Sequence, residues 1–279
     1  MLFGKHELFT ISDGTFKLDG GAMFGIVPKP LWNKLSPADS RNRITLALNC
    51  LLVRTGIGKN ILIDTGLGTR YDEKSNDIYD INRNPGLEEN LKFVGVKPED
   101  IDFVILTHLH FDHCGGNVKL DSNGNLIPAF PNAKYIIQKK EWEDALNPNE
   151  RTRGSYREDD LLPIEKAGQL QLIDGDCEVL PCIRTAVTGG HTRGHQVVII
   201  ESEGRHCIFW GDLIPTSGHI NLPYVMSYDI LPLDTIKEKK KWEDKVVSEA
   251  WLSHFEHDPK VTFAKLTCTG KRFSVTPVS

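Results

Sequence analysis

The feature that most constrains this chain of 279 residues is a cluster of metal-ligand side chains between residues 107 and 116. Its sequence is Thr107-His108-Leu109-His110-Phe111-Asp112-His113-Cys114-Gly115-Gly116, and it directly follows the apolar segment Phe103–Leu106, an expected buried strand. If the extended backbone continues, His108 and His110 point to the same face, because side chains alternate along a strand. Asp112 and His113 then lie in the following turn, and the glycine pair lets the backbone bend closely around them. Imidazoles and carboxylates at this spacing predict a divalent-metal site, with zinc as the first choice.

Apolar segments of strand length alternate with helical segments along the chain. The other expected strands are Ile44–Val53, Asn60–Ile63, Tyr135–Ile137, Val179–Val187, Gln196–Ile200 and Cys207–Trp210. The expected helices are Leu87–Phe93, Lys140–Leu146 and a long charged helix from a cap at Asp234 to about Ala250. Helices between buried strands in both halves predict a layered α/β fold in which helices cover sheets. No linker, charge block or repeat divides the sequence, so we expect a single domain over residues 1–279.

Composition narrows the classes of partner. The net charge of -5 argues against a nucleic-acid-binding surface, which normally needs a basic patch. No segment approaches the roughly 18 apolar residues of a membrane span, and Met1–Thr10 has no apolar run behind a basic start. The six cysteines are scattered without a C-x-x-C pair, which favours reduced thiols over a disulfide framework. We therefore expect a cytoplasmic protein that acts on a small molecule, not on nucleic acid or a membrane.

The cluster His108-x-His110-x-Asp112-His113 resembles the histidine motif of the metallo-β-lactamase superfamily. The similarity extends over most of the chain, because the other motifs of the superfamily follow in order. They are Ile61-Leu62-Ile63-Asp64-Thr65-Gly66, Gly190-His191-Thr192-Arg193-Gly194-His195, Phe209-Trp210-Gly211-Asp212 and Ser253-His254-Phe255-Glu256-His257-Asp258-Pro259. The resemblance implies an αβ/βα sandwich, in which two central mixed sheets are flanked by helices and the site lies at one edge of the sheets.

The resemblance also implies a set of ligands for two metal ions. The first metal would take His108, His110 and His191, the second would take Asp112, His113 and His257, and Asp212 would be shared between them. Asp64 would lie behind the ligands and orient one of them, or Asp112, through hydrogen bonds. Two zinc ions are expected, although iron, manganese or cobalt also suit such ligands.

Two positions in this set have competing histidines. His191 and His195 are an even number of residues apart, so strand geometry alone does not separate them. The resemblance favours His191, and His195 would then open the next strand and support the site. His254 and His257 are an odd number apart, so in extended backbone only one of them points at the metals. The resemblance favours His257, which leaves His254 as a supporting or core residue.

The predicted reaction is hydrolysis. Two zinc ions roughly 3.5–4 Å apart lower the pKa of a bridging water towards 7, and the resulting hydroxide attacks a carbonyl or phosphoryl centre. The metals stabilise the developing oxyanion. Asp112 is the expected catalytic residue, because a ligand near the bridging water can carry the proton to the leaving alkoxide.

Two segments outside the motifs are candidates for the substrate pocket, residues 20–32 and residues 213–233. Neither has the pattern of a regular element, and both carry large apolar groups, which suit either a pocket wall or a loop that covers the core. Their candidate pocket residues are Met23, Phe24, Trp32, His219, Tyr224 and Tyr228. Together the segments resemble those of the quorum-quenching N-acyl homoserine lactonase branch.

One departure from that branch matters for the substrate. The best-known lactonases place a tyrosine shortly after the bridging aspartate, whereas Leu213, Ile214 and Pro215 follow Asp212 here. Tyr224, Tyr228 and His219 are the candidates to replace it. Despite this departure, the resemblance of the two segments favours a lactonase. The alternative is a phosphotriesterase, phosphodiesterase or other ester hydrolase. A non-catalytic metal-binding scaffold is disfavoured because every ligand is present, and a homodimer stays open.

Overall fold

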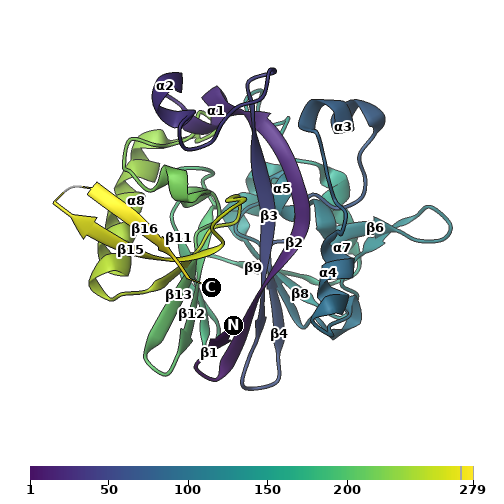
Figure 1. Ribbon diagram of the computed structural model, residues 1–279. Helices are drawn as coiled ribbons and strands as arrows, with labels where there is room; N and C mark the ends of the chain where they lie inside the picture. The colour runs from purple at the N-terminus through teal and green to yellow at the C-terminus, as the bar shows by residue number, and fades with distance from the viewer. Residues whose placement is uncertain (271, 279) are drawn as a thin grey trace.

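Two mixed β-sheets face each other at the centre of the protein, in a computed structural model that describes residues 1–270 and 272–278 (Figure 1). The first sheet consists, in spatial order, of β1 (Leu2–Phe3), β2 (His6–Asp19), β3 (Arg43–Arg54), β4 (Asn60–Ile63), β5 (Phe103–Ile105), β8 (Lys134–Gln138) and β9 (Leu170–Ile173). The second consists of β10 (Cys177–Leu180), β11 (Ile183–Val187), β12 (Gln196–Ser202), β13 (Arg205–Phe209), β14 (Leu252–His254), β15 (Phe263–Thr269) and β16 (Arg272–Pro277). A separate hairpin pairs β6 (Val118–Leu120) with β7 (Leu126–Pro128).

Helices surround the two sheets (Figure 1). They are α1 (Gly20–Phe24), α2 (Lys29–Trp32), α3 (Glu73–Tyr79), α4 (Leu87–Phe93), α5 (Phe111–Cys114), α6 (Lys139–Leu146), α7 (Leu162–Lys166) and α8 (Pro232–Ser248). Helices α4, α6 and α7 pack on the first sheet, and α8 packs on the second, so the two flanks lie on opposite sides of the molecule (Figure 1). Among the described residues, none of the helices combines the length and the apolar character that crossing a membrane requires.

The largest buried contact between the sheets is aliphatic. Side chains such as Ile63 and Ile105 from the first sheet meet Val198 and Ile200 from the second in one core cluster. The two other faces are buried against helices, for example through Leu91 of α4. Burying each sheet on both faces explains the near-continuous apolar strands of the sequence. The predicted sandwich of two mixed sheets flanked by helices is confirmed, and the single domain over residues 1–279 stays a prediction.

Three expected elements differ from the structure. Val179–Val187 is not one strand but the hairpin β10–β11, because Pro181 lacks the N–H that a continuous ladder needs. Residues 20–32 are not irregular, because the Asp19 side chain accepts a hydrogen bond from the Ala22 amide and starts the short helix α1. Helix α8 starts at Pro232, so Asp234 lies inside its first turn instead of capping it.

Several elements were not predicted from the sequence, and strand β2 is the longest of them. Its 14 residues alternate irregularly between buried and partly exposed positions, and a bulge shifts its register on β3 between Ser12 and Thr15. A bulge breaks the period-two alternation on which strand prediction rests.

The parallel pairs β4–β5 and β13–β14 place four strand ends at one edge of the sandwich. The chain leaves β4 at Asp64, β5 at Leu106, β13 at Trp210 and β14 at Phe255. Parallel neighbours end at the same edge of a sheet, so the segments that follow these strands are brought together. Four of the predicted histidine and aspartate motifs lie at these four strand ends. The fifth, Gly190–His195, lies in the connection between β11 and β12.

Candidate metal centre

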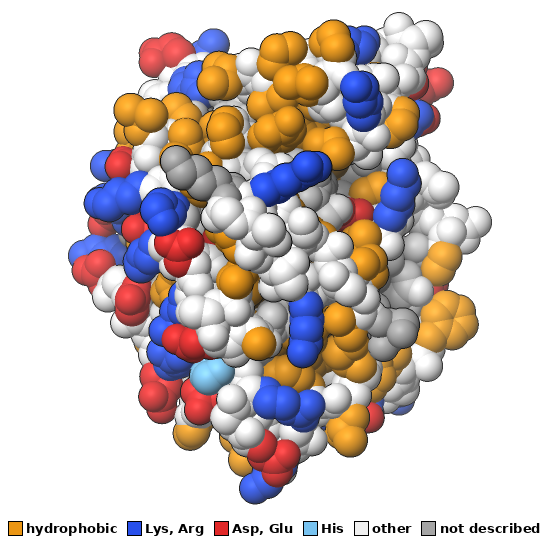
Figure 2. All heavy atoms as spheres, turned by 60° about the vertical axis from the view of Figure 1, so that its left-hand side comes forward, with side chains coloured by type: hydrophobic (Ala, Val, Ile, Leu, Met, Phe, Trp, Pro, Cys, Tyr) orange, Lys and Arg blue, Asp and Glu red, His pale blue; other side chains and the backbone are white. Residues whose placement is uncertain are grey.

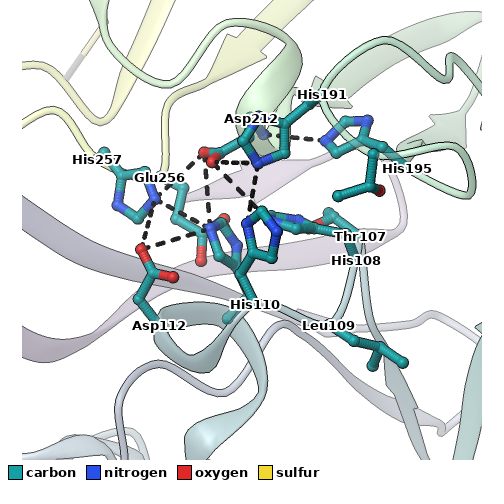
Figure 3. Close-up of polar contacts among 12 residues, drawn as sticks. Thr107, His108, Leu109, His110, Asp112, His191, His195, Asp212, Glu256 and His257 are labelled. Atoms are coloured by element: carbon teal, nitrogen blue, oxygen red, sulfur yellow. Dashed lines mark hydrogen bonds and ion pairs between the residues drawn. The ribbon is translucent and has the colours of Figure 1, made fainter. Parts of the chain in front are cut away.

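The first group of converging side chains contains His108, His110, His191 and Asp212, and one ligand atom of each lies within 4.8 Å of the others. All four side chains are buried. Nε2 of His191 lies 3.1 Å from Nδ1 of His110 and 3.1 Å from Oδ2 of Asp212. Nε2 of His108 lies 3.8 Å from the same carboxylate oxygen. Figure 3 shows these rings pointing toward one another beneath Asp212.

The second group contains Asp112, His113 and His257, again with converging ligand atoms. Nε2 of His257 lies 3.0 Å from Nε2 of His113 and 3.7 Å from Oδ2 of Asp112. Oδ1 of Asp212 lies 3.3 Å from Nε2 of His257 and 3.6 Å from Nε2 of His113. The two oxygens of Asp212 therefore face different groups, Oδ2 the first and Oδ1 the second (Figure 3).

The atoms in these groups are arranged for cations and not for hydrogen bonds with one another. Two imidazole nitrogens at about 3 Å, as in the pair His113 and His257, share at most one proton between them. Among the described residues, Nε2 of His108 and Oδ1 of Asp212 have no hydrogen-bond partner although both atoms are buried. Buried polar atoms are normally paired, so this set of nitrogen and oxygen donors fits metal ions.

Burial and the neighbouring imidazoles hold the pKa of His108 and of His110 well below the usual range of histidine. The cost of placing a positive charge in a buried site is the larger cause, and repulsion from protonated neighbours adds to it. Both rings are therefore neutral at pH 7. A neutral imidazole keeps the lone pair that a metal requires.

The turn that carries Asp112 and His113 has its shape because residues 115–116 pass very close to the backbone of residues 65–67. His108 lies beyond the end of β5, and Asp112 and His113 lie in the one-turn helix α5 instead of an irregular turn. A side chain on Gly115 or Gly116 would collide with the backbone of residues 65–67. The glycine pair is therefore required by this close approach and not by a bend around the ligands.

Asp64 lies directly behind His113. Its Oδ2 is 3.0 Å from Nδ1 of His113, and the amide and hydroxyl of Thr107 donate to its two oxygens at 2.7 and 2.6 Å. Asp64 itself has a left-handed backbone, with φ of 55°. The expectation that Asp64 orients a ligand therefore agrees with its contacts, but the partner is His113 and not Asp112.

A second carboxylate, Glu256, also faces His113 and was not singled out from the sequence. Its Oε2 lies 3.0 Å from Nδ1 of His113, the same ring atom that Asp64 faces. Burial and the negative charge of Asp64 raise the pKa of Glu256 well above its usual range. Glu256 precedes His257 in the last motif, but no local pattern distinguishes it from an exposed acidic residue.

The structure separates His191 from His195. His191 belongs to the first group, whereas Nε2 of His195 accepts a hydrogen bond from the Asp212 amide at 3.0 Å. The other ring nitrogen of His195 lies 2.6 Å from the Thr188 hydroxyl. His195 therefore supports the backbone of Asp212 immediately before β12 begins, as expected for a residue outside the ligand set.

The structure also separates His257 from His254. His254 lies in β14, where Nε2 is 3.1 Å from the Thr10 hydroxyl and the ring stacks on Phe209 with centroids 5.0 Å apart. Phe263 packs against its other side. His254 is thus packed in the core, which is one of the two roles that the sequence left open for it. Its strand position turns it to the face opposite the cluster.

Glu141, on α6, joins three segments around the site and was also missed. Its Oε1 accepts hydrogen bonds from the Leu109 amide at 3.1 Å and the Tyr156 hydroxyl at 3.0 Å, and its Oε2 accepts one from the Thr192 hydroxyl at 2.6 Å. The ring of Tyr156 packs on His110. No sequence motif marks Glu141, because its partners lie far from it along the chain.

A cavity of about 200 Å³ opens beside the two groups, and His110, Asp112, His191, Asp212 and His257 form its floor. Of the six expected pocket residues, Met23 and Tyr228 line this cavity. Met226, from the expected segment 213–233, also lines it. The lining residues that sequence analysis missed are Leu18, Leu46, Tyr79, Phe111, Gly154 and Ser155. Seven of the fourteen lining residues are apolar or aromatic, and such a mixture of apolar wall and convergent polar groups is usual for small-molecule sites.

The other four expected pocket residues, Phe24, Trp32, His219 and Tyr224, do not line the cavity. They form an aromatic stack behind its wall, in which Phe24 lies 5.6 Å from Trp32 and 4.3 Å from His219 between ring centroids. Tyr224 meets Phe24 edge to face. His219 uses both ring nitrogens locally, with Nε2 2.9 Å from the Met23 carbonyl. The structure therefore places these four rings in the packing between residues 20–32 and residues 213–233, and not on the surface of the cavity.

The comparisons agree with this geometry. Residues 44–253 match the metallo-beta-lactamase superfamily. An N-acyl homoserine lactonase from Bacillus cereus is 35% identical over 231 residues, which are 78% of this chain and 83% of that protein.

Solved structures resemble the whole sandwich. A protein from Staphylococcus aureus, described as a probable metal-dependent hydrolase, superposes with a TM-score of 0.91 and 32% identity, covering 100% of this chain and 99% of that one. An N-acyl homoserine lactone hydrolase, solved with the product N-hexanoyl-L-homoserine bound at its catalytic metal centre, has a TM-score of 0.69 and 26% identity. That match covers 91% of this chain and 93% of the other.

Proposed function

Because this chain belongs to the metallo-beta-lactamase superfamily, we propose that it is a dinuclear zinc hydrolase that opens the ring of N-acyl homoserine lactones. The observation that carries the proposal is the position of Asp212, whose two carboxylate oxygens face two separate groups of buried ligand atoms. The relatives named as lactonases supply the substrate class.

In this proposal His108, His110 and His191 hold one metal, and Asp112, His113 and His257 hold the other, with Asp212 between them. When bound, two zinc ions would lower the pKa of a water between them and polarise the carbonyl of the substrate. Asp64 and Glu256 hold His113, and His195 holds the backbone of Asp212, so the ligands are fixed before a metal arrives. Iron, manganese and cobalt are the alternatives to zinc, and metal analysis of the purified protein distinguishes them.

The cavity supports an acyl lactone as substrate. Its floor carries the polar groups, and Leu18, Leu46 and Met226 give its wall an apolar surface for an acyl chain. Asp112 is at once a cavity residue and a neighbour of His257, with 3.7 Å between Oδ2 and Nε2. Ring opening adds the hydroxyl of water to the carbonyl carbon and breaks its bond to the ring oxygen. We assign Asp112 the transfer of the remaining water proton to that oxygen.

The structure narrows the search for a residue in place of the missing tyrosine. Of the three candidates, Tyr228 alone lines the cavity, because His219 and Tyr224 are packed behind its wall. We assign the phenol of Tyr228 as a donor to the substrate. Replacing Tyr228 with Phe should lower kcat/KM about tenfold, which corresponds to one lost hydrogen bond of about 1.4 kcal/mol.

A panel of substrates tests the proposal directly. Purified protein with two equivalents of zinc is assayed on N-acyl homoserine lactones of increasing chain length, simple carboxylic esters and phosphotriesters. Ring opening is followed by the acid released. Turnover of lactones with a preference for acylated rings supports the proposal. Turnover of phosphoesters alone would replace it with the phosphotriesterase alternative, and turnover of none with metal bound would indicate a scaffold.

Two wider expectations stay predictions. Figure 2 shows hydrophobic side chains gathered at the upper end of one face, where α1 and α2 lie, and Ile26, Leu31 and Leu35 in this region are 85%, 49% and 45% exposed. Such a patch would suit the contact of a homodimer, which light scattering after gel filtration tests.

All six cysteines are free, which suits the expected cytoplasmic location, and fractionation of the native cells tests that location.

A further inference from the structure

Asp229 is a buried carboxylate that neither the motifs nor the ligand set includes. It is 2% exposed and lies between the 3-10 turn Ser217–His219 and α8. Its Oδ1 lies 2.8 Å from Nδ1 of His191. Nε2 of the same ring faces His110 and Asp212 in the first group. With its Nδ1 proton directed at Asp229, His191 turns an unprotonated Nε2 toward that group.

The backbone around Asp229 is tied to the same histidine motif. The amide of Ile230 donates to the His191 carbonyl at 3.1 Å, and the amide of Leu231 donates to the Gly190 carbonyl at 2.8 Å. Gly190 has a φ of 79°, and a side chain there would collide with Thr235. The backbone that carries the Asp229 carboxylate is therefore fixed to the backbone of the histidine motif by these two hydrogen bonds.

The segment that carries Asp229 is also part of the cavity wall, to which it contributes Met226 and Tyr228. Arg151 joins it to another part of that wall, because its Nη2 donates to the carbonyls of Ser227 at 2.6 Å and Asp229 at 3.0 Å. The segment of Arg151 supplies Gly154 and Ser155 to the cavity. The support of His191 and the substrate wall are thus one connected structure.

We propose that Asp229 is a positioning residue that acts through His191, fixing its tautomer and ring direction for the first metal. The inference rests on the proposed function in taking the first group as a metal site. Carboxylates that accept the second ring N–H of a ligating histidine typically change metal affinity by about 10–100-fold when removed. Loss of Asp229 should therefore weaken one metal and leave the other, which His113 and His257 hold, bound as before.

The test measures zinc affinity, not turnover. Metal-free wild type, Asp229→Ala and Asp229→Asn are titrated with zinc against a chromophoric chelator. We expect one of the two sites to weaken by about 10–100-fold in Asp229→Ala. The loss should be smaller in Asp229→Asn, because its amide oxygen still accepts the Nδ1 proton. The visible spectrum of the cobalt-substituted protein should change in Asp229→Ala, since it reports the ligand field of the bound ion.

Asp234→Asn is the matched control, because Asp234 is an exposed carboxylate five positions along in α8. It should leave both zinc affinities and the cobalt spectrum unchanged. Circular dichroism in excess chelator shows whether the metal-free variants are folded. A folded Asp229→Ala protein with two wild-type affinities and an unaltered cobalt spectrum would overturn the inference.

The outcome is separable from that of the proposed function. A wild-type protein that binds two zinc ions but opens no lactone removes the proposed substrate and leaves the role of Asp229 open to the same titration. A wild-type protein that binds one zinc ion or none contradicts the dinuclear centre itself.

Discussion

The edge that gathers the histidines and aspartates and the wall of the adjoining cavity are built in different ways. At the edge, each ligand follows a strand or lies in a short turn, and buried groups behind several ligands fix their direction, as Asp64 does for His113. At the wall, apolar side chains come from unrelated elements, such as Leu18 of β2, Leu46 of β3 and Met226 of the segment before α8. An aromatic stack of Phe24, Trp32 and His219 supports the wall from behind. Polar groups need a specific direction, whereas an apolar surface needs only a shape, so local motifs mark the edge and not the wall.

The same contrast applies to the histidines. The rings of His108 and His113 at the edge turn a nitrogen toward the cluster. His219 instead uses both ring nitrogens, and His254 its Nε2, for hydrogen bonds within the core. An imidazole is therefore a ligand in one region and a packing element in the other. The following changes separate the two uses.

The largest effect is expected for Asp212→Ala, which removes the carboxylate that faces both groups. Both metals should be lost or greatly weakened, and kcat/KM should fall by about 10³-fold or more, comparable to about 4 kcal/mol of transition-state stabilisation. Metal content by mass spectrometry and lactone kinetics measure this. Retention of both metals with near-normal turnover would remove Asp212 from the centre.

Comparing His257→Ala with His254→Ala shows which of these two histidines binds metal and which one only packs in the core. His257→Ala should lose one metal and about 10²-fold of activity, because it removes a ligand. His254→Ala should keep both metals but lower the free energy of unfolding by about 2–4 kcal/mol, because it leaves a cavity between Phe209 and Phe263. Metal content and urea unfolding are measured for both, and the opposite pattern would reassign the ligand.

The buried His219 should make stability depend on pH. Burial lowers its pKa from 6.5 to about 4. Between pH 4 and pH 6.5 the unfolded chain binds a proton at His219 that the folded chain does not. The free energy of unfolding therefore has its full value above pH 6.5 and decreases as the pH falls toward 4. From pH 7 to pH 5 the loss should be about 2 kcal/mol, a factor of about 30 in the folding equilibrium.

His219→Gln removes this titration. The change in unfolding free energy between pH 7 and pH 5 should be smaller in the variant than in wild type by that amount. Urea titrations of both proteins at each pH, in chelator to exclude metal release, measure the difference. Equal pH dependence in the two proteins would show that His219 titrates normally in the fold.

The smallest effect is expected at the wall. Met226→Trp should fill part of the cavity and raise KM for long-chain lactones about tenfold, with little change for short chains, since about 1.4 kcal/mol of apolar contact is lost. Trp32→Phe, which alters the stack behind the wall, should leave KM unchanged and lower the melting temperature. An equal KM effect from both variants would mean that the stack reaches the substrate after all.

The sequence alone was sufficient for the layered fold and for the ligand candidates. Buried strands such as Asn60–Ile63 and the helix Leu87–Phe93 have the predicted bounds, because apolar runs and turn residues are local signals. The spacing of residue types within one short cluster located His108 and His110, because metal ligands must converge on a small volume. Asp212 was located by the resemblance to the metallo-β-lactamase superfamily. Strand β2 escaped prediction because its bulge breaks the alternation.

What only the tertiary structure decided is which side chains meet. The competition between His191 and His195 was settled by the pairing of distant segments, since an even spacing leaves both on the same side of a strand. Asp229, Glu141 and Glu256 support the site through partners far away in sequence, or through a fold that buries them, so no local pattern marks them. Spacing and residue type are local properties of a chain, whereas a buried carboxylate acquires its partner only when the sheets pack.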